Sequence, residues 1–176
     1  MARELNYRLE DEQIFFPQNV ERAHDEAAQE LQEKKDRIEA TEKKKKDRIM
    51  KKNAADIRKV FDYEDDDFII MVPECWMDFK KEGNEQHNCV ATYYERAVQG
   101  KTIILFIRRK AEPNKSFCTV EIGRKGMNFT IVQNRIIYNK EAPEEAVRFM
   151  KRAVEQAQKK INRKMKKERV QVTVAV

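Results

Sequence analysis

The sequence predicts an α+β protein in which a small antiparallel meander sheet of about three to five strands is covered by helices. A long charged N-terminal helix or helix pair is predicted to precede the sheet. Two observations lead to this prediction. First, 39% of the 176 residues are charged, and charged residues dominate both flanks of the sequence. Second, short apolar runs separated by turn residues are concentrated in the middle. The predicted organisation is a charged helical region over 1–62, an α+β core with a basic C-terminal helix over 63–169, and a tail or edge strand over 170–176.

The first region is predicted to be helical. Pro17 and Asn19 are typical of a helix start, and no Gly or Pro follows them before about Phe61. Between Leu31 and Ile49 too few apolar residues recur to bury a helix face. We therefore expect one helix, or a pair, that is packed at its ends and solvated in the middle, with a poorly ordered middle as the alternative.

The middle region has the pattern of consecutive short strands. The apolar run over Asp66–Trp76 is stopped by Pro73, which is typical of a short strand or buried segment. Lys101–Arg109 is apolar and β-branched, as expected for a strand that is buried on both faces. Turn residues over Ala111–Lys115 follow it. Short connections of this kind predict strands that pair with their neighbours along the chain.

The next segments predict a hairpin. Gly126 suits a positive-φ turn, and Asn128–Asn134 has the composition of the returning strand. Ser116–Gly123 alternates between two kinds of side chain, so the two faces of this strand differ. One predicted face holds Cys118, Val120 and Ile122, and the other holds Phe117, Thr119 and Glu121.

The last region predicts a helix that covers the meander. Pro143 and two glutamates are typical of a helix start. Ten basic residues stand against two acidic ones between Arg148 and Arg169, a net charge of +8. The alternating tail beyond this stretch could add a strand to a sheet edge or hang free. The apolar stripe of the helix consists of Val147, Met150, Val154, Ala157 and Ile161.

The polar stretch Glu82–Tyr94 predicts a helix from near Asn84 to Val98 that Gly100 ends. At about 100° per residue, His87 and Cys89 on one helix point about 200° apart. A Cys–His dyad needs its partners within hydrogen-bond reach, so this spacing excludes it. Cys89 is therefore expected to be a buried, inert core residue.

Several reaction classes lack the residues they need. No paired His or Cys spacing indicates a metal site, so no metal is expected, and no cofactor is identified. A serine nucleophile has little support because Ser116 is the only serine. The three cysteines form no motif and no leader or membrane span is recognised, which favours a cytoplasmic protein with reduced thiols and no membrane partner.

A set of polar residues is predicted to gather around one face of the sheet. Glu121 is its most informative member, because a carboxylate flanked by Val120 and Ile122 must face solvent, a salt-bridge partner or a cleft. An exposed sheet face is the simpler explanation of this spacing. The set consists of His87, Arg108, Thr119, Glu121, Gln133 and Asn139.

The order of short motifs resembles the PcfJ-like domain of conjugative plasmids and bacteriophages. The motifs are EG, HNCV and a Tyr, then ILFIRR, a Pro and TVEI, then IVQN and an Asn. Phe16–Glu26 is also similar to the helical segment that precedes this domain, and the resemblance extends to Phe149. Asn88 and Ala91 depart from the family pattern, which has His and Gly there. The matching positions are Glu82, Gly83, His87, Cys89, Val90, Tyr93, Arg108, Thr119, Glu121, Gln133 and Asn139.

The resemblance implies a protein of a mobile genetic element that works near DNA transfer or its control. Together with the basic charge, it favours an accessory protein that acts on or near nucleic acid, in transfer or in counter-defence. A solvated helix face is the simpler explanation of the charge alone. The predicted nucleic-acid-binding residues are Lys159, Lys160, Arg163, Lys164, Lys166 and Lys167.

Two further hypotheses belong to other classes. In the first, the protein is a small hydrolase or nuclease in which His87 and Glu121 act as general acid and base. Arg108 would steady a phosphate there, with Gln133 as a further candidate. In the second, the protein is a non-catalytic module whose helices dock a transfer ATPase or a host-defence protein.

Overall fold

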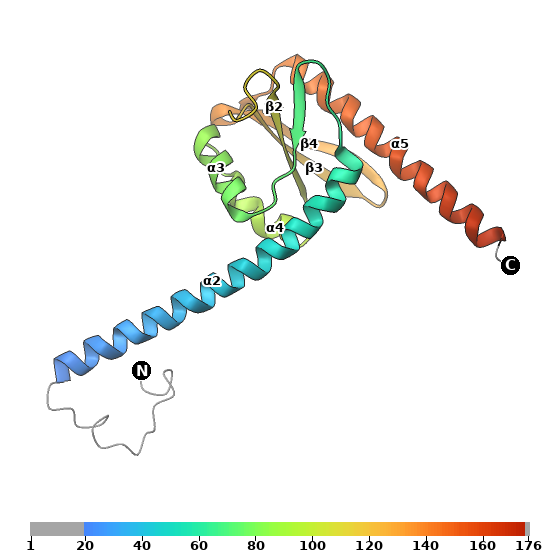
Figure 1. Ribbon diagram of the computed structural model, residues 1–176. Coiled ribbons are helices and arrows are strands. Elements are labelled where there is room, and N and C mark those ends of the chain that lie inside the picture. The colour runs from blue at the N-terminus through green and yellow to red at the C-terminus, as the bar shows by residue number, and fades with distance from the viewer. Residues whose placement is uncertain (1–19, 175–176) are drawn as a thin grey trace. The chain divides into compact units, whose positions relative to one another are not determined.

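The computed structural model describes residues 20–174, with side chains described for Val20 and for 22–166, and its fold is α+β, as the sequence predicts (Figure 1). The described strands form one antiparallel sheet in the order β1-β2-β3-β4-β5, so each strand pairs with the next along the chain. The elements, with η for a 3-10 helix, are α2 (Val20–Phe61), β1 (Phe68–Met71), α3 (Trp76–Gln86), η2 (Val90–Tyr93), α4 (Tyr94–Val98), β2 (Ile103–Arg109), β3 (Cys118–Lys125), β4 (Asn128–Ile136), η3 (Ile137–Asn139), β5 (Lys140–Glu141) and α5 (Glu144–Val174).

The predicted N-terminal helix is a single helix, α2, of 42 residues. The chain divides into two compact units, residues 1–45 and 46–176. In the first unit, every described side chain of α2 is exposed or half-buried, as expected for a helix with sparse apolar residues. Pro17 and Asn19, which were predicted to start the helix, lie outside the described residues.

One face of the sheet is covered by α5 and the last turns of α2. Leu105 of β2 and Val120 of β3 share a buried apolar cluster with Phe61 of α2 and Phe149 of α5. Cys118 and the other residues predicted for this face of β3 belong to the same cluster. The alternation in the sequence therefore identified the core face of this strand.

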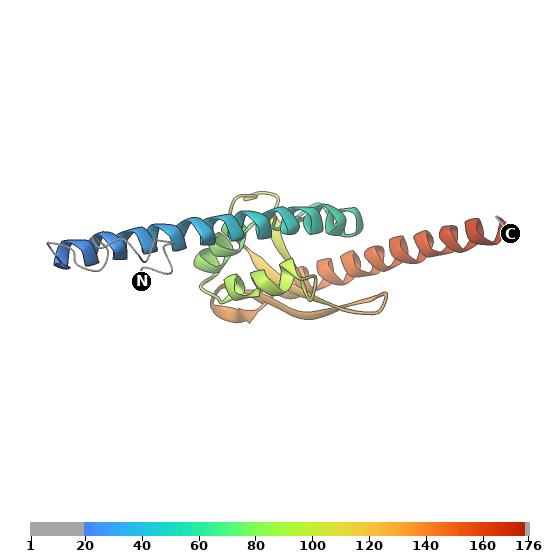
Figure 2. The same ribbon diagram turned by 90° about the horizontal axis from the view of Figure 1, so that it is seen from below.

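The opposite face is covered by α3, η2 and α4, which lie side by side (Figure 2). Ile104 and Phe106 of β2 pack there with Phe79 of α3 and Tyr94 of α4. Because successive strand residues point to opposite faces, this second cluster and the first one sandwich β2. The prediction that β2 is buried on both faces is confirmed.

Helix α5 covers the sheet as predicted, and it is longer than expected. Glu144 and Glu145 lie in its first turn, where negative charge favours the helix dipole. The helix continues to Val174, so the predicted edge strand over 170–176 is wrong as far as Val174. A helix that is already formed gains one hydrogen bond for each added residue, whereas a strand must find a sheet edge. The fully buried residues of α5 are Ala146, Phe149, Met150, Ala153 and Ala157.

The single helix predicted from Asn84 to Val98 is wrong, because α3 ends at Gln86. His87 takes a left-handed conformation with φ of 48°, and the backbone N–H groups of His87 and Asn88 donate to the carbonyl oxygen of Gly83. A Cβ at Gly83 would meet the Asn88 carbonyl oxygen at 3.2 Å, so the turn folds closely over the glycine. The chain restarts as a 3-10 helix at Val90.

This turn also overturns the prediction for Cys89. The thiol is exposed rather than buried, because Cys89 lies in the turn and not on the apolar face of a continuous helix. An exposed Cys89 does not pack in the core in the way that the helical periodicity predicted. The core thiol of this protein is Cys118, in β3.

Candidate functional site

The polar side chains on the α3 side of the sheet begin with a buried carboxylate, Glu82. It occupies α3 one turn after the core residue Phe79, so its side chain faces the sheet, and that side chain is 0% exposed. Arg108 of β2 forms an ion pair with it, Thr119 Oγ1 of β3 donates to Oε1 at 2.8 Å, and Ser116 Oγ donates to Oε2 at 2.6 Å. This Glu82 cluster joins α3 to two strands.

Arg108 belongs to the Glu82 cluster and is not free to contact a substrate. Its guanidinium is buried against Glu82 and also donates to its neighbouring carbonyl oxygen, at Ile107, over 3.2 Å. The sequence predicted Arg108 as a phosphate contact, and the structure instead turns it towards Glu82 of α3. Its position holds α3 against the sheet.

Glu121 lies on the same face and is also buried, with 8% of its side chain exposed. Thr102 Oγ1 donates to Oε1 at 2.9 Å, and Gln133 Nε2 of β4 donates to Oε2 at 3.0 Å. The same Gln133 nitrogen also donates to the Tyr93 hydroxyl oxygen at 3.1 Å. Arg96 of α4 approaches Oε1 at 3.7 Å. The exposed-face explanation of Glu121 is therefore wrong, because helices cover this face.

A polar hollow of about 350 Å³ opens beside Glu121. A backbone irregularity between Glu121 and Ile122 shifts the register of β3 on β4 at this point, and such bulges often redirect side chains near functional sites. The hollow combines a carboxylate, a guanidinium, a phenol, amides and the Cys89 thiol. Its lining residues are Asn88, Cys89, Val90, Tyr93, Ile104, Thr119, Glu121, Gln133, Arg135 and Asn139.

His87 borders a second, shallower hollow, which shares Asn88, Cys89 and Asn139 with the first. Its exposed ring stacks on Tyr138 of η3, with ring centroids 4.8 Å apart. Within the described part of the chain, no hydrogen bond or ion pair joins His87 to Glu121. The two candidate acid–base residues therefore line neighbouring hollows rather than one.

Unusual backbone conformations gather at these hollows. His87, Tyr138 and Asn139 are the non-glycine residues with positive φ in the part of the chain that the structure describes, at 48°, 59° and 57°. Conformations of this kind cost free energy and tend to persist where function requires them. The turn after α3 and the η3 turn thus form the strained rim of the candidate site.

The arrangement limits the chemistry that the hollow can perform. Hydrogen bonds hold both Glu121 oxygens, so the carboxylate is fixed where it can accept a proton or stabilise positive charge. Tyr93, Arg135 and Asn139 offer groups that can bind polar oxygens of a ligand. Over residues 20–174, no group of three or more His, Cys, Asp or Glu side chains is arranged to hold a metal ion.

Sequence reasoning missed the role of Glu82, although a signal for it was present. Phe79 and Glu82 are three residues apart, so an apolar face of α3 that includes Phe79 also includes Glu82. A carboxylate on such a face implies a buried cation, and Arg108 is the partner. Thr102 lay inside the predicted strand Lys101–Arg109, one residue before β2 begins, and carried no comparable signal.

The predicted nucleic-acid-binding residues lie on the C-terminal half of α5. The side chains of Lys159, Arg163, Lys164 and Lys166 are exposed, and that of Lys160 is half-buried and donates to the Asp62 carbonyl oxygen at 3.1 Å. Helix α5 has lost its fully buried stripe after Ala157, so this half presents mainly charge. The side chain of Lys167 lies outside the described ones. None of the helices within the described ranges is long and apolar enough to cross a membrane.

Comparison with known proteins finds a matching family and a relative for most of the chain. A family model described as PcfJ-like protein matches residues 1–150. An uncharacterized protein of Listeria innocua serovar 6a is 31% identical over 123 residues, which cover 69% of this chain and 25% of that protein. The chain therefore matches about a quarter of the length of that relative. No solved structure matches the chain.

Proposed function

Because this chain belongs to the PcfJ-like protein family, we propose that it is an accessory protein of a mobile genetic element, a plasmid or a phage, that binds nucleic acid through α5. The mobile-element setting rests on the resemblance of the motifs. The proposed binding of nucleic acid rests on the basic surface of α5. Such binding would serve either of two roles, DNA transfer or counter-defence.

The charge on α5 is the observation that carries this proposal. Residues 159–167 contain six basic and no acidic side chains. Lys159, Arg163 and Lys166 are exposed, and they recur at spacings of three and four that bring side chains onto one side of a helix. Phosphates neutralised by such a row release counterions, which favours binding to a polyanion of any sequence.

Charge neutralisation tests this surface. We expect replacement of Lys159, Arg163 and Lys166 by Gln to weaken binding to a labelled 20-base-pair duplex. The slope of log affinity against log salt should become shallower by about 2 to 3, because each lost phosphate contact removes about 0.9 from it. Fluorescence anisotropy at several salt concentrations measures both quantities.

A matched control separates this surface from net charge. Lys80, Lys101 and Lys140 are exposed outside α5, and their replacement by Gln removes the same charge. We expect this control variant to keep a salt slope within about 1 of the parent. Equal loss in the two triple variants, or an affinity that does not depend on salt, would contradict the proposal.

A second function, hydrolysis of a phosphodiester at the hollow, is favoured by one further observation. Two positive-φ residues, His87 and Asn139, line these hollows, and the third, Tyr138, stacks on the His87 ring. In this mechanism Glu121 accepts a proton and His87 donates one, each through a bound water or substrate group, since no direct hydrogen bond joins them. Arg135 of the hollow, rather than Arg108, contacts the phosphate oxygens, because Glu82 occupies Arg108.

A further inference from the structure

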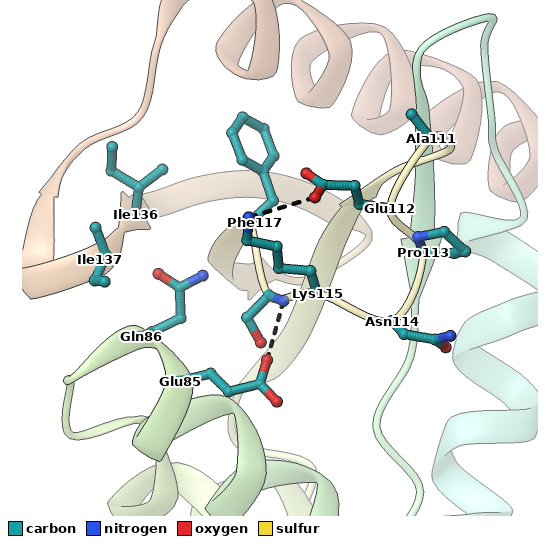
Figure 3. A pocket seen from close by; sticks show the side chains of 11 residues that line it. Glu85, Gln86, Ala111, Glu112, Pro113, Asn114, Lys115, Phe117, Ile136 and Ile137 are labelled. Atoms are coloured by element: carbon teal, nitrogen blue, oxygen red, sulfur yellow. Dashed lines mark hydrogen bonds and ion pairs between the residues drawn. The ribbon is translucent and has the colours of Figure 1, made fainter.

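Two aromatic rings lie face to face at the rim of the candidate site. The rings of His87 and Tyr138 are stacked, with an angle of 11° between their planes and centroids 4.8 Å apart. His87 belongs to the turn after α3 and Tyr138 to η3, so segments distant in the sequence form the pair. Figure 3 shows how close these segments lie, because Gln86 and Ile137, the residues that precede the pair, line one cavity.

This stack lies on the surface of the protein. Tyr138 is 62% exposed although one face of its ring lies on His87, so the opposite face and the edge of the ring are open to solvent. His87 is exposed as well. Ring contacts that stabilise the core are buried, as those of Phe79 and Tyr94 are. The His87–Tyr138 stack instead presents a flat aromatic face to the solvent.

The backbone on both sides of the stack takes conformations that cost free energy. His87 and Tyr138 lie in the left-handed region, with φ of 48° and 59°, and neither is a glycine. A contact that buries little apolar area gains little free energy from packing to offset this cost. Strain of this kind is found mainly at catalytic and ligand-binding sites. The stack is therefore a candidate recognition element.

The chemistry around the stack indicates the ligand that it suits. An exposed aromatic face binds other flat rings by stacking, and unpaired nucleobases bind proteins in this way. Asn139 follows Tyr138 directly and lines both polar hollows, and Arg135 lines the hollow beside Glu121. The ion pair of Arg135 with the exposed Glu141 is long, at 3.8 Å, so a phosphate can replace it. An amide and a guanidinium suit the sugar and phosphate that accompany a base.

We propose that the His87–Tyr138 stack is a platform for one unpaired base, and that the nucleic acid this protein recognises is single-stranded. The base stacks on the free face of Tyr138, and Arg135 contacts the adjoining phosphate. This inference rests on the proposed binding of nucleic acid and names its substrate class. The basic row on α5 attracts any polyanion, whereas the bases of a duplex are stacked on one another and cannot use the platform.

Replacement of the ring tests the platform. We expect Tyr138→Leu to lower the affinity for a labelled single strand by at least about fivefold, the lower end of what one stacked base contributes. Tyr138→Phe keeps the ring and should stay within about twofold of the parent protein. Met77→Ala is the matched control, because Met77 is 57% exposed at the opposite end of α3. This control should also keep the parent affinity.

A duplex of the same length separates the platform from α5. Tyr138→Leu should leave the affinity for the duplex within about twofold, because paired bases do not reach the ring. Replacement of the α5 row, Lys159, Arg163 and Lys166, by Gln should instead weaken binding to the single strand and the duplex alike. Fluorescence anisotropy measures these affinities, and circular dichroism checks that each variant is folded.

A photocrosslink tests the contact itself. A single strand that carries 5-iodouracil crosslinks on irradiation to aromatic side chains on which this base stacks. Digestion and mass spectrometry of the irradiated complex should place the crosslink at Tyr138 in the parent protein. The same peptide should be free of crosslink in Tyr138→Leu.

Three results would refute the platform. These are a single-strand affinity that Tyr138→Leu leaves unchanged, an equal loss of single-strand and duplex affinity in that variant, and crosslinks confined to other residues. Failure of the α5 proposal has a different signature, which is binding that depends neither on salt nor on the α5 row. A parent protein that binds neither nucleic acid refutes both proposals.

Discussion

Arg108 and Glu82 form a buried ion pair between β2 and α3, with 8% and 0% of their side chains exposed. Thr119 and Ser116 donate the remaining hydrogen bonds to the Glu82 carboxylate. Removal of one partner from such a pair leaves an uncompensated charge in the interior, whereas exposed pairs contribute little. Arg108 is therefore better explained as a residue that fixes the candidate site than as one that contacts a substrate.

The first prediction concerns the stability that depends on this pair. We expect Arg108→Met to lower the free energy of unfolding by about 3 to 5 kcal/mol, because Glu82 then stays buried without its cation. The exposed pair formed by the next residue in β2, Arg109, with Glu145 is the matched control. Arg109→Met should cost about 1 kcal/mol or less, part of it from lost packing on Phe117. Urea unfolding at neutral pH measures both.

A double variant sharpens this test. Replacement of Glu82 and Arg108 together, each by Met, removes both charges and should recover at least about 1 kcal/mol relative to Arg108→Met alone. Equal costs for Arg108→Met and Arg109→Met would show that the buried pair is no more important than the exposed one.

The second prediction concerns the order of thiol reactivity. Cys89 is exposed in the turn after α3, so a maleimide should modify it first. Cys118 should remain unmodified in the native protein at pH 8, because burial, and then the nearby negative charge of Glu82, raise its pKa to about 12. Burial also raises the pKa of Cys75, which is half-buried and should react at an intermediate rate. Mass spectrometry of peptides at timed intervals measures the order.

Unfolding provides the control for this order. In denaturant the three cysteines should react at similar rates, because the environments that distinguish them are lost. Modification of Cys118 before Cys89 in the native protein would contradict the burial that the structure gives to these two residues.

The strands were predictable because their signals are local. The apolar run of β2 and the alternation of β3 each specify burial within a few residues, and the structure confirms both. The same reasoning placed Thr119 and Glu121 together on the opposite face of β3 from Val120. A period of two along a strand is enough to identify which side chains share a face.

The candidate site was only partly predictable because its decisive contacts are not local. The turn at His87 depends on Gly83 being packed closely under Asn88, and the residues at the turn itself include no Gly or Pro to announce it. Likewise, Glu82 and Arg108 are 26 residues apart, and no periodicity connects them. Residue types and faces could be inferred, whereas the pairing of Arg108 required the fold.

The last prediction tests catalysis at the hollow beside Glu121. If the hollow hydrolyses phosphodiesters, Glu121→Gln and His87→Ala should each reduce cleavage of a labelled single-stranded DNA or RNA by at least about 100-fold, the range of a lost general acid or base. The double variant should cleave no more slowly than the less active single variant, because the effects of residues that act as a unit are not additive. His24→Ala, at the other histidine, which is exposed on α2, is the matched control and should keep full activity.

Stability separates a catalytic loss from a folding defect in these variants. Glu121 accepts hydrogen bonds from Thr102 and Gln133, so Glu121→Gln should itself cost about 1 to 3 kcal/mol of unfolding free energy. His87→Ala should cost less than about 1 kcal/mol, because its ring is exposed and its stacking partner among the described residues is Tyr138. A His87→Ala protein that is folded and inactive would therefore support chemistry at the hollow. Full cleavage by both variants, or no cleavage by the parent protein, would leave the hollow without a catalytic role and the surface of α5 as the functional part.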